Sequence, residues 1–326
     1  MAGQYSHLQF FRRTPNALLA RYFQEKHGVL QEIAFDELKE IQVEPIFQGF
    51  LALPEDKQAQ FEAECQDIDA MACQGGVKAL ADEADFYEDK AFPAAMSKID
   101  GFHGAVMWAF LEHPRYWTGA TLFLQADNIS ESLWKKRNDL PHVTPDVDNE
   151  NVERLAAAIG EHFHSTEGRG RNCKVEVFRR YEKEYFFAYP EDFAQSGMEW
   201  MRNALSPRAR HPAFEIIFVY SKTEGSLDIH APRNTAAVPD LQRVFAETIL
   251  KFDDLDELAE DNRVYALDAL ANRDFEFTYP TDCGIESVAV RLLRFSLITG
   301  KKRRVIVEAD PGGDRLAGRP GRAVRL

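Results

Sequence analysis

Cysteine is scarce in this chain of 326 residues, which contains only four. None of them forms a CxxC pair, and their density is far below that of the disulfide frameworks that hold small secreted proteins together. The sequence therefore predicts a fold without disulfides in a reducing compartment, and we expect a cytoplasmic protein. The four residues are Cys65, Cys73, Cys173 and Cys283.

Long apolar runs are missing too. The opening stretch, MAGQYSHLQFFRRTPNALLARYF, has no apolar segment of about 7 to 15 residues such as an export signal requires. Nowhere do about 18 apolar residues follow one another, as they would in a helix that spans a membrane. The sequence thus predicts neither export nor a membrane partner.

The familiar signatures of catalysis are absent as well. The chain has no GxSxG, HExxH or P-loop motif, and GRGR at 168–171 lacks the length and the Lys-Ser/Thr end of a phosphate loop. His162 and His164 are two residues apart on a predicted helix, where they diverge by about 200° and cannot bind one ion. The sequence accordingly predicts no metal site and no cofactor.

What the chain does have is the composition of a folded globular protein, with 45% hydrophobic and 12% aromatic residues. Its net charge of −14 is unevenly spread. Residues 1–165 carry 14 basic and 27 acidic residues, a net charge of −13, whereas residues 166–326 carry 25 and 26, a net charge of −1. Such asymmetry suggests different partners for the two halves, and we expect a protein partner for the acidic one.

The first half, residues 1–147, is predicted to be an acidic helical domain. Thr14-Pro15 is a helix start signal, apolar residues follow at helical spacing, and Gly28 is suited to end that helix. Further helical runs are predicted at 36–42, 55–73, 77–89, 94–112 and 129–137.

The second half, residues 148–310, is predicted to be an α+β domain with mainly antiparallel strands. The segment 148–164 has apolar residues at helical spacing and is expected to bridge the two halves. After it, apolar residues alternate as in strands. The predicted strands are FEIIFVY (214–220), SLDIHA (226–231), FEFTY (275–279), VAVRLLRFSL (288–297) and RRVIVEA (303–309), with a helix at VFAETILKF (244–252).

The last residues, 311–326, have no aromatic residue and no periodicity, and we expect a disordered tail there. The strand before them would then leave an uncovered sheet edge, unless an earlier element pairs with it or the chain ends before its domain does.

Three stretches together resemble a recurring, uncharacterised bacterial protein type: KVEVFRRYEKEYFFAYPEDF, FEIIFVYSKTEGSLDIHAP and GIESVAVRLLRFSLITGKKRRVIVEADP. The resemblance covers about residues 172–310. It implies a bacterial, cytoplasmic setting and further strand and helix after ADP, where this chain departs from the pattern. No activity is attached to it.

Basic and aromatic residues interleave in GRGRNCKVEVFRRYEKEYFFAYP, residues 168–190. A two-residue turn at Tyr181-Glu182 would pair Phe178 with Tyr185, and a three-residue turn would shift that pairing and mix the faces. Because side chains alternate along a strand, the two-residue turn sorts them cleanly. One face would carry Val175, Val177, Phe186 and Ala188, and the other Phe178, Tyr185, Phe187 and Tyr189.

An aromatic face turned to solvent is the arrangement that stacks unpaired bases, at roughly 1 to 3 kcal/mol per base. The first hypothesis is therefore a binding or regulatory protein that contacts single-stranded nucleic acid. The alternative for this face is a second helical layer that covers the aromatic rings. The residues of the nucleic-acid hypothesis are Arg169, Arg171, Lys174, Phe178, Arg180, Lys183, Tyr185, Phe187, Tyr189, Lys301, Lys302 and Arg303.

Further basic groups occur at WKKR (134–137) and at Arg208 and Arg210. In the second hypothesis these basic clusters bind protein and no nucleic acid. They would meet an acidic protein partner or the chain's own acidic half, and the chain would be a protein-interaction component of a bacterial complex.

The third hypothesis is a hydrolase that uses Glu215, Asp228 and His230. If Tyr220 pairs with Leu227, Asp228 and His230 share one strand face and Glu215 lies at its far end. A carboxylate beside an imidazole can tune a general base. A solvated sheet face accounts for the same residues, and on balance the sequence favours a protein that is not an enzyme.

Overall fold

A computed structural model describes residues 5–201, 204–253 and 255, positions 277, 278 and 288, and the segments 292–296 and 304–308. Contacts within the chain group residues 1–264 into one compact unit and residues 265–326 into a second. Each unit is described by itself. The predicted domain boundary after residue 147 runs through the first unit.

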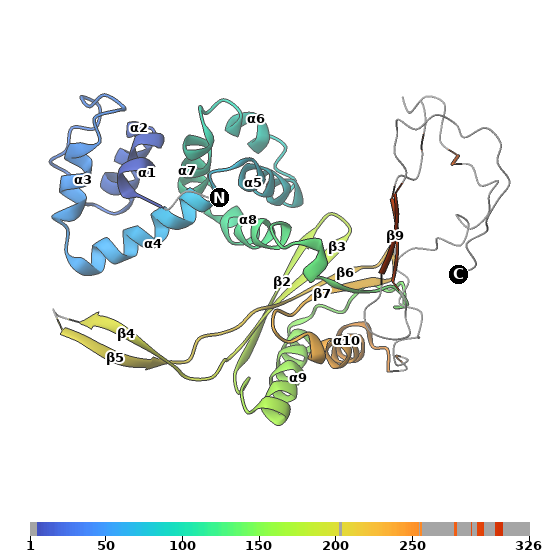
Figure 1. The fold of residues 1–326 in the computed structure, drawn as a ribbon. Coiled ribbons are helices and arrows are strands. Elements are labelled where there is room, and N and C mark those ends of the chain that lie inside the picture. Colours follow the sequence, from blue (N-terminus) through green and yellow to red (C-terminus); the bar gives the residue numbers. More distant parts are fainter. Residues whose placement is uncertain are drawn as a thin grey trace. The chain divides into compact units, whose positions relative to one another are not determined.

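The first half of this unit is helical, as predicted. Figure 1 shows these helices as coiled ribbons. Their core is rich in aromatic rings that meet edge to face, such as Phe23 on Phe61 and Phe11 on Phe50. The elements are α1 (His7–Arg13), α2 (Asn16–Ala20), the π-helix η1 (Arg21–Lys26), α3 (Glu44–Leu51), α4 (Glu55–Met71), α5 (Gln74–Phe86), α6 (Phe92–Met96), α7 (Phe102–Glu112) and α8 (Pro114–Asp127).

Two of the predicted helical runs are wrong. Residues 36–42 form turns, because the side chain of Asn16 donates to the carbonyl oxygen of Leu38 and the carboxylate of Glu40 accepts from the Asn16 backbone. In 129–137 only the 3₁₀ turn η2 (Glu131–Leu133) is helical, and β1 (Lys135–Arg137) follows as a strand. The backbone of β1 pairs with a sheet strand instead of forming helical bonds.

The remaining helix predictions are confirmed with one division and three omissions. The run 94–112 is divided between α6 and α7 at Gly101, whose φ of 72° suits glycine. The sequence interpretation missed α1, α3 and α8, of which α8 is the helix that contacts the sheet. Its signals are Pro114 at the first helical turn and buried residues at helical spacing, Tyr116, Ala120, Phe123 and Leu124.

A five-stranded antiparallel sheet follows, in the order β1-β7-β6-β3-β2, and confirms the α+β prediction. The helix α9 (Asn149–Glu167) precedes it, with the Asp148 carboxylate capping its first turn and Gly168 ending it at a φ of 75°. The strands are β2 (Cys173–Arg180), β3 (Lys183–Pro190), β6 (Ile216–Ser221) and β7 (Ser226–His230), followed by η3 (Thr235–Ala237), α10 (Val238–Phe245) and η4 (Ala246–Leu250).

The predicted registers of both hairpins are confirmed. Phe178 pairs with Tyr185 and Val177 with Phe186, around a turn in which Tyr181 has a φ of 55°. In the next hairpin Tyr220 pairs with Leu227. The period of two and the two-residue turn together fix which side chains share a face.

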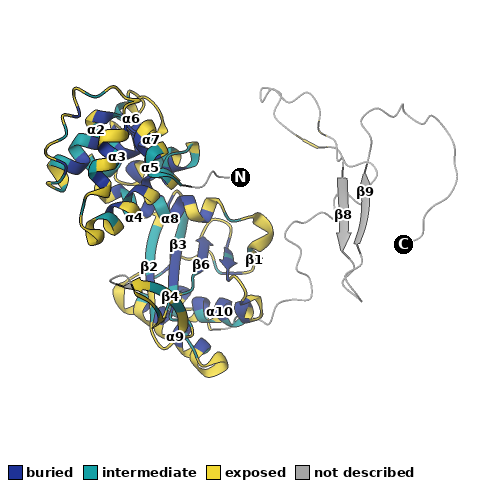
Figure 2. Cartoon of the chain, turned by 60° about the vertical axis from the view of Figure 1, so that its left-hand side comes forward, coloured by how far each residue is buried: buried dark blue, intermediate teal, exposed yellow. Residues whose placement is uncertain are grey.

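Helices cover both faces of this sheet. The first face packs Phe186 and Phe218 against Phe245 of α10, with Leu155 and Ile159 of α9 in the same cluster. The second face contacts α8 through Phe123. Figure 2 shows the central strands dark blue, which marks them as buried.

A long ribbon interrupts the hairpin of β3 and β6. It consists of β4 (Gln195–Met201) and β5 (Ala204–Arg210), which pair with each other and extend away from the five-stranded sheet (Figure 1). We call residues 195–210 the arm. The sequence interpretation assigned no strand there. The segment contains Pro207, and proline is rare inside sheets because it has no backbone N–H to donate to the neighbouring strand.

In the second unit, β8 (Leu292–Ser296) pairs antiparallel with β9 (Arg304–Glu308), and both fall within strands predicted from the sequence. Of the predicted strand at 275–279, only Phe277 and Thr278 are described, and neither is in a strand. The tail at 311–326 lies outside the described residues. Among the helices that the structure describes, none is long and apolar enough to cross a membrane.

Candidate functional site

The aromatic face of the β2–β3 hairpin is covered, so the base-stacking arrangement required by the first hypothesis is not formed. The ring of Phe123 in α8 meets the rings of Tyr185 and Phe178 at centroid distances of 5.1 and 6.3 Å. Phe187 is fully buried, and Tyr189 is half-buried. The residues of this face were predicted correctly, and the alternative, a helical layer that covers the aromatic rings, is confirmed, although α8 itself was not predicted.

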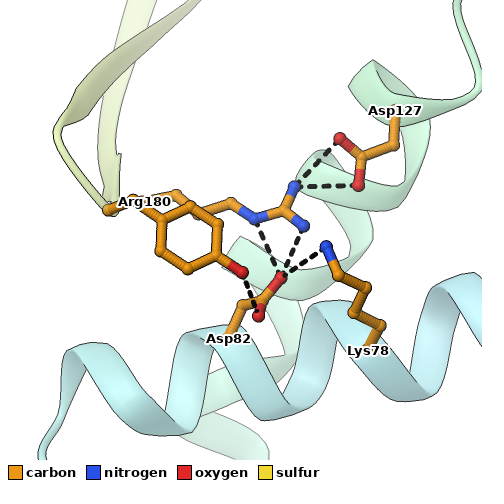
Figure 3. A network of polar contacts seen from close by, with 5 residues as sticks. Lys78, Asp82, Asp127 and Arg180 are labelled. Atoms are coloured by element: carbon orange, nitrogen blue, oxygen red, sulfur yellow. Dashed lines mark hydrogen bonds and ion pairs between the residues drawn. The ribbon is translucent and has the colours of Figure 1, made fainter. Parts of the chain in front are cut away.

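Arg180, predicted at an exposed tip, is instead a buried residue that joins the hairpin to two helices (Figure 3). Its Nη1 donates to both carboxylate oxygens of Asp127 at 2.8 and 2.9 Å. Its Nε and Nη2 donate to one carboxylate oxygen of Asp82 at 3.0 and 2.5 Å. The neighbouring Tyr181 hydroxyl donates to the other oxygen of Asp82 at 2.5 Å, and Lys78 lies 3.5 Å from that carboxylate.

Arg169 also has a structural role, at the base of the arm. Its guanidinium donates to the Asp192 carboxylate at 2.8 Å and to the Asn234 side-chain oxygen at 2.6 Å. It lies over the ring of Phe214, 4.1 Å from the centroid. Asp192 lies just before the arm and Phe214 just after it, so one guanidinium holds the two ends of the arm together.

The other predicted basic residues do not gather into one surface with the aromatic rings. Arg171 and Lys174 are exposed, and Lys174 forms an ion pair with Glu176. Lys183 is half-buried on β3. Lys301, Lys302 and Arg303 lie outside the described residues.

Asp228 and His230 share one face of β7, as the register requires, and Glu215 comes directly before β6. No hydrogen bond or ion pair joins the three side chains within the described part of the chain. Gln125 donates to Glu215 at 2.5 Å, and Tyr189 bonds the same carboxylate. His230 lies against the ring of Trp134, and its Nδ1 is buried without a hydrogen-bond partner in the described structure.

Burial raises the pKa values of both carboxyls in this trio. It raises the pKa of Asp228, which Lys136 and Lys183 counter in part, and it raises the pKa of Glu215, which the Tyr189 hydrogen bond counters. The two carboxyls therefore have different charged and polar neighbours. The arrangement provides neither a coupled acid–base pair nor a nucleophile.

Glu83 is the buried titratable group nearest to the Arg180 network, one residue after Asp82 in α5. Burial raises the pKa of its carboxyl to about 7, and the positive charge of Arg180 opposes part of that rise. One carboxyl oxygen has no hydrogen-bond partner in the described structure. The side chain lies against α8 at Gly119, where a Cβ atom would occupy the place of the carboxyl.

The arm exposes several large apolar side chains on one face. Because Trp200 pairs with Leu205 and Met198 with Pro207, these side chains lie on one face. Trp200 is 70% exposed, Met198 61% and Leu205 49%. Arg208 and Arg210 lie on the opposite face, within 3.7 and 3.5 Å of Glu199.

No protein-family model, curated protein or solved structure matches this chain. The function is therefore argued from the geometry of these residues.

Replacing Arg180 with Met should lower the free energy of unfolding by about 3 kcal/mol, because the largely buried Asp82 carboxylate loses the guanidinium and keeps only Tyr181 and Lys78 as partners among the described residues. Urea unfolding measures the change. Arg179→Met is the matched control: this neighbour is half exposed and pairs with Glu184 at 3.5 Å, so its loss should cost less than about 1 kcal/mol. Equal effects of the two substitutions would contradict the role given to Arg180.

Glu83→Gln should stabilise the protein more at pH 8 than at pH 5. The folded carboxyl has a pKa of about 7, above its ordinary value, so the folded state holds a proton that the unfolded state releases. Stability is therefore lost as pH rises through about 7, and glutamine cannot ionise. Urea unfolding should show that Glu83→Gln raises the free energy of unfolding, relative to wild type, by roughly 2 to 3 kcal/mol more at pH 8 than at pH 5. The control is Asp85→Asn, at an exposed position of the same helix, which should leave the pH dependence of stability unchanged. If stability changed with pH in the same way in Glu83→Gln and in wild type, the role given to Glu83 would be wrong.

Proposed function

We propose that this chain is a protein-interaction component that binds its partner through the apolar face of the arm, without nucleic acid. The observation that carries the proposal is the exposure of Trp200, Met198 and Leu205 on one side of a projecting ribbon. Exposed apolar side chains that cluster on one face are typical of surfaces that bind other proteins. Tryptophan is also among the residues that contribute most to such interfaces.

The way in which the base of the arm is anchored supports the same proposal. A two-stranded ribbon is marginally stable on its own in water, so it needs anchoring. The Arg169 cluster anchors its base, and backbone bonds from Asp192 to Pro212 and from Phe214 to Pro190 continue the pairing. An arm fixed in this way loses little conformational entropy when a partner binds.

The nucleic-acid hypothesis loses its stacking surface, and Arg208 and Arg210 of the arm do not replace it. Both arginines lie beside the carboxylate of Glu199, which reduces their attraction for phosphate. The chain's net charge of −14 adds a general repulsion. These observations favour a protein partner over a nucleic acid.

A photo-crosslinking amino acid at position 200 should give a discrete protein adduct when the full chain is expressed in its native host. The physical reason is that this side chain would lie inside the interface. Denaturing gels and mass spectrometry of the adduct provide the measurement. Position 206, which faces the opposite side of the same ribbon, is the matched control. An absence of adducts at 200, or the same adducts at both positions, would remove the support for this function.

The chain should show no salt-sensitive retention on single-stranded DNA or RNA, because its aromatic face is covered and its surface is acidic. Chromatography on immobilised oligonucleotides at low and high salt tests this expectation. Retention that weakens steeply with salt and that is lost in Arg208→Ala with Arg210→Ala would instead support nucleic-acid binding by the arm.

A further inference from the structure

We propose that two copies of this chain pair through the outer edge of β2, so that their two sheets join into one. The inference goes beyond the proposed function, because it concerns a different surface from the arm. The partner at this edge is a second copy of the same strand, with the pairing centred on Val175.

The outer edge of β2 lies at one side of the five-stranded sheet (Figure 2). In an antiparallel pair, alternate residues bond to the neighbouring strand, and the residues between them turn their N–H and C=O groups away. The Asn172 carbonyl accepts from the Glu191 N–H at 2.7 Å, and Arg180 pairs with Lys183 next to the turn. The even-numbered residues therefore bond to β3, and the odd-numbered ones make no backbone hydrogen bond to another segment that the structure describes. These outward residues are Cys173, Val175, Val177 and Arg179.

The two edges of the sheet differ. β1 has only three residues, all of them basic, which is a common protection against pairing with another chain. β2 has eight residues in unbroken register with β3 and contains neither proline nor glycine. Such a long, regular edge is a template for a further strand.

The charges of β2 select a second copy as that strand. Lys174 and Glu176 lie on the same face of the strand, one on each side of Val175. When two copies of β2 run antiparallel with Val175 opposite Val175, Lys174 of each copy stands opposite Glu176 of the other. Opposite charges in such cross-strand pairs stabilise a sheet. The sequence around Val175 is thus complementary to itself, as a two-fold interface requires.

Neighbouring registers lose this complementarity. A centre at residue 174 sets Lys174 against Lys174, and a centre at residue 176 sets Glu176 against Glu176. Like charges directly opposite one another destabilise a sheet. In a single copy the Lys174 ammonium reaches along the strand to its own Glu176, and the lysine side chain stays 74% exposed, within reach of a second copy.

The other cations near this edge have anions beside them. Arg180 is buried between the carboxylates of α5 and α8, and Arg179 lies 3.5 Å from Glu184 of its own copy. The register places Arg171 opposite Arg179 of the second copy, and Arg171 lines a groove together with two glutamates of α9. The reciprocal pairs beside Val175 therefore decide the register.

That groove leaves room for the added strand. It has a volume of about 440 Å³ and lies between α9 and residues 170–173, and its lining includes the small residues Ala156 and Gly160 of α9. Val177 of the second copy would stand opposite Cys173, on the face that packs against α9. Half-exposed in a single copy, this valine would be removed from water in the groove, and its burial adds to the backbone bonds of the edge.

Val175→Pro should abolish the dimer that the wild type forms. Proline lacks the N–H that would bond to the second copy, whereas the bonds of β2 to β3 remain because that N–H points away from β3. Val175→Thr keeps the N–H and the branched shape, so it is the matched control and should dimerise like the wild type. Sedimentation velocity of the full chain over a concentration series measures association, and circular dichroism verifies that each variant is folded.

A mixture of two charge variants tests the register. Lys174→Glu gives each copy two carboxylates beside Val175, and Glu176→Lys gives each copy two ammonium groups. Either variant alone should associate at least about 10-fold more weakly than the wild type. Mixed together, they set opposite charges against each other in both pairs and should form a one-to-one dimer as tight as that of the wild type. Neither position is buried, so this experiment decides the matter if Val175→Pro does not fold.

A wild type that stays monomeric at every concentration overturns the inference. A dimer that persists in folded Val175→Pro overturns it too, because the copies would then join elsewhere. So does a mixture of the charge variants that associates no better than each variant alone. These results leave the proposed function in place, because crosslinking at position 200 tests the arm and not the edge of β2.

Discussion

The guanidinium of Arg180 is the contact on which the arrangement of this protein depends. It is 4% exposed and lies between the carboxylates of Asp82 in α5 and Asp127 in α8. Removing a cation from water is costly, and here two carboxylates and several hydrogen bonds compensate for that cost. The contact fixes the hairpin tip against two helices. The ring of Phe123 then covers Tyr185 and Phe178, and the aromatic face becomes part of a core.

Covering both faces of the sheet changes where the protein can interact. The aromatic residues that make 168–190 conspicuous in the sequence stabilise the fold, and the arm presents apolar side chains to solvent in their place. Arg169 and Arg180 illustrate the same change. Both belong to a segment that resembles a nucleic-acid surface, yet one holds the base of the arm and the other joins the sheet to the helices.

The sequence predicted what depends on local rules. Alternation and the two-residue turn were enough for the register of both hairpins, including the pairing of Phe178 with Tyr185. It left open whether solvent or a helical layer covers the aromatic face, because the contact of Arg180 with Asp82 joins residues 98 positions apart. The helix α8 had a recognisable pattern and was overlooked, whereas the arm has Pro207 in its second strand and lacks the long apolar alternation of buried strands. The grouping of Asp228 with His230 was predicted correctly, but their separate neighbours could not be.

The position of β1 has a consequence for the order in which the chain folds during synthesis. Residues 135–137 leave the ribosome before α9 and before every other strand of the sheet, yet they pair with β7, which follows about 90 residues later. The apolar side of α8 is likewise made before the hairpin that covers it. Nascent chains fold from the N-terminal side as they emerge, so the apolar side of α8 stays uncovered until β3 has been made, and β1 stays unpaired until β7 has been made. Molecular chaperones that bind exposed apolar segments would therefore find this surface of α8 accessible midway through translation and covered afterwards.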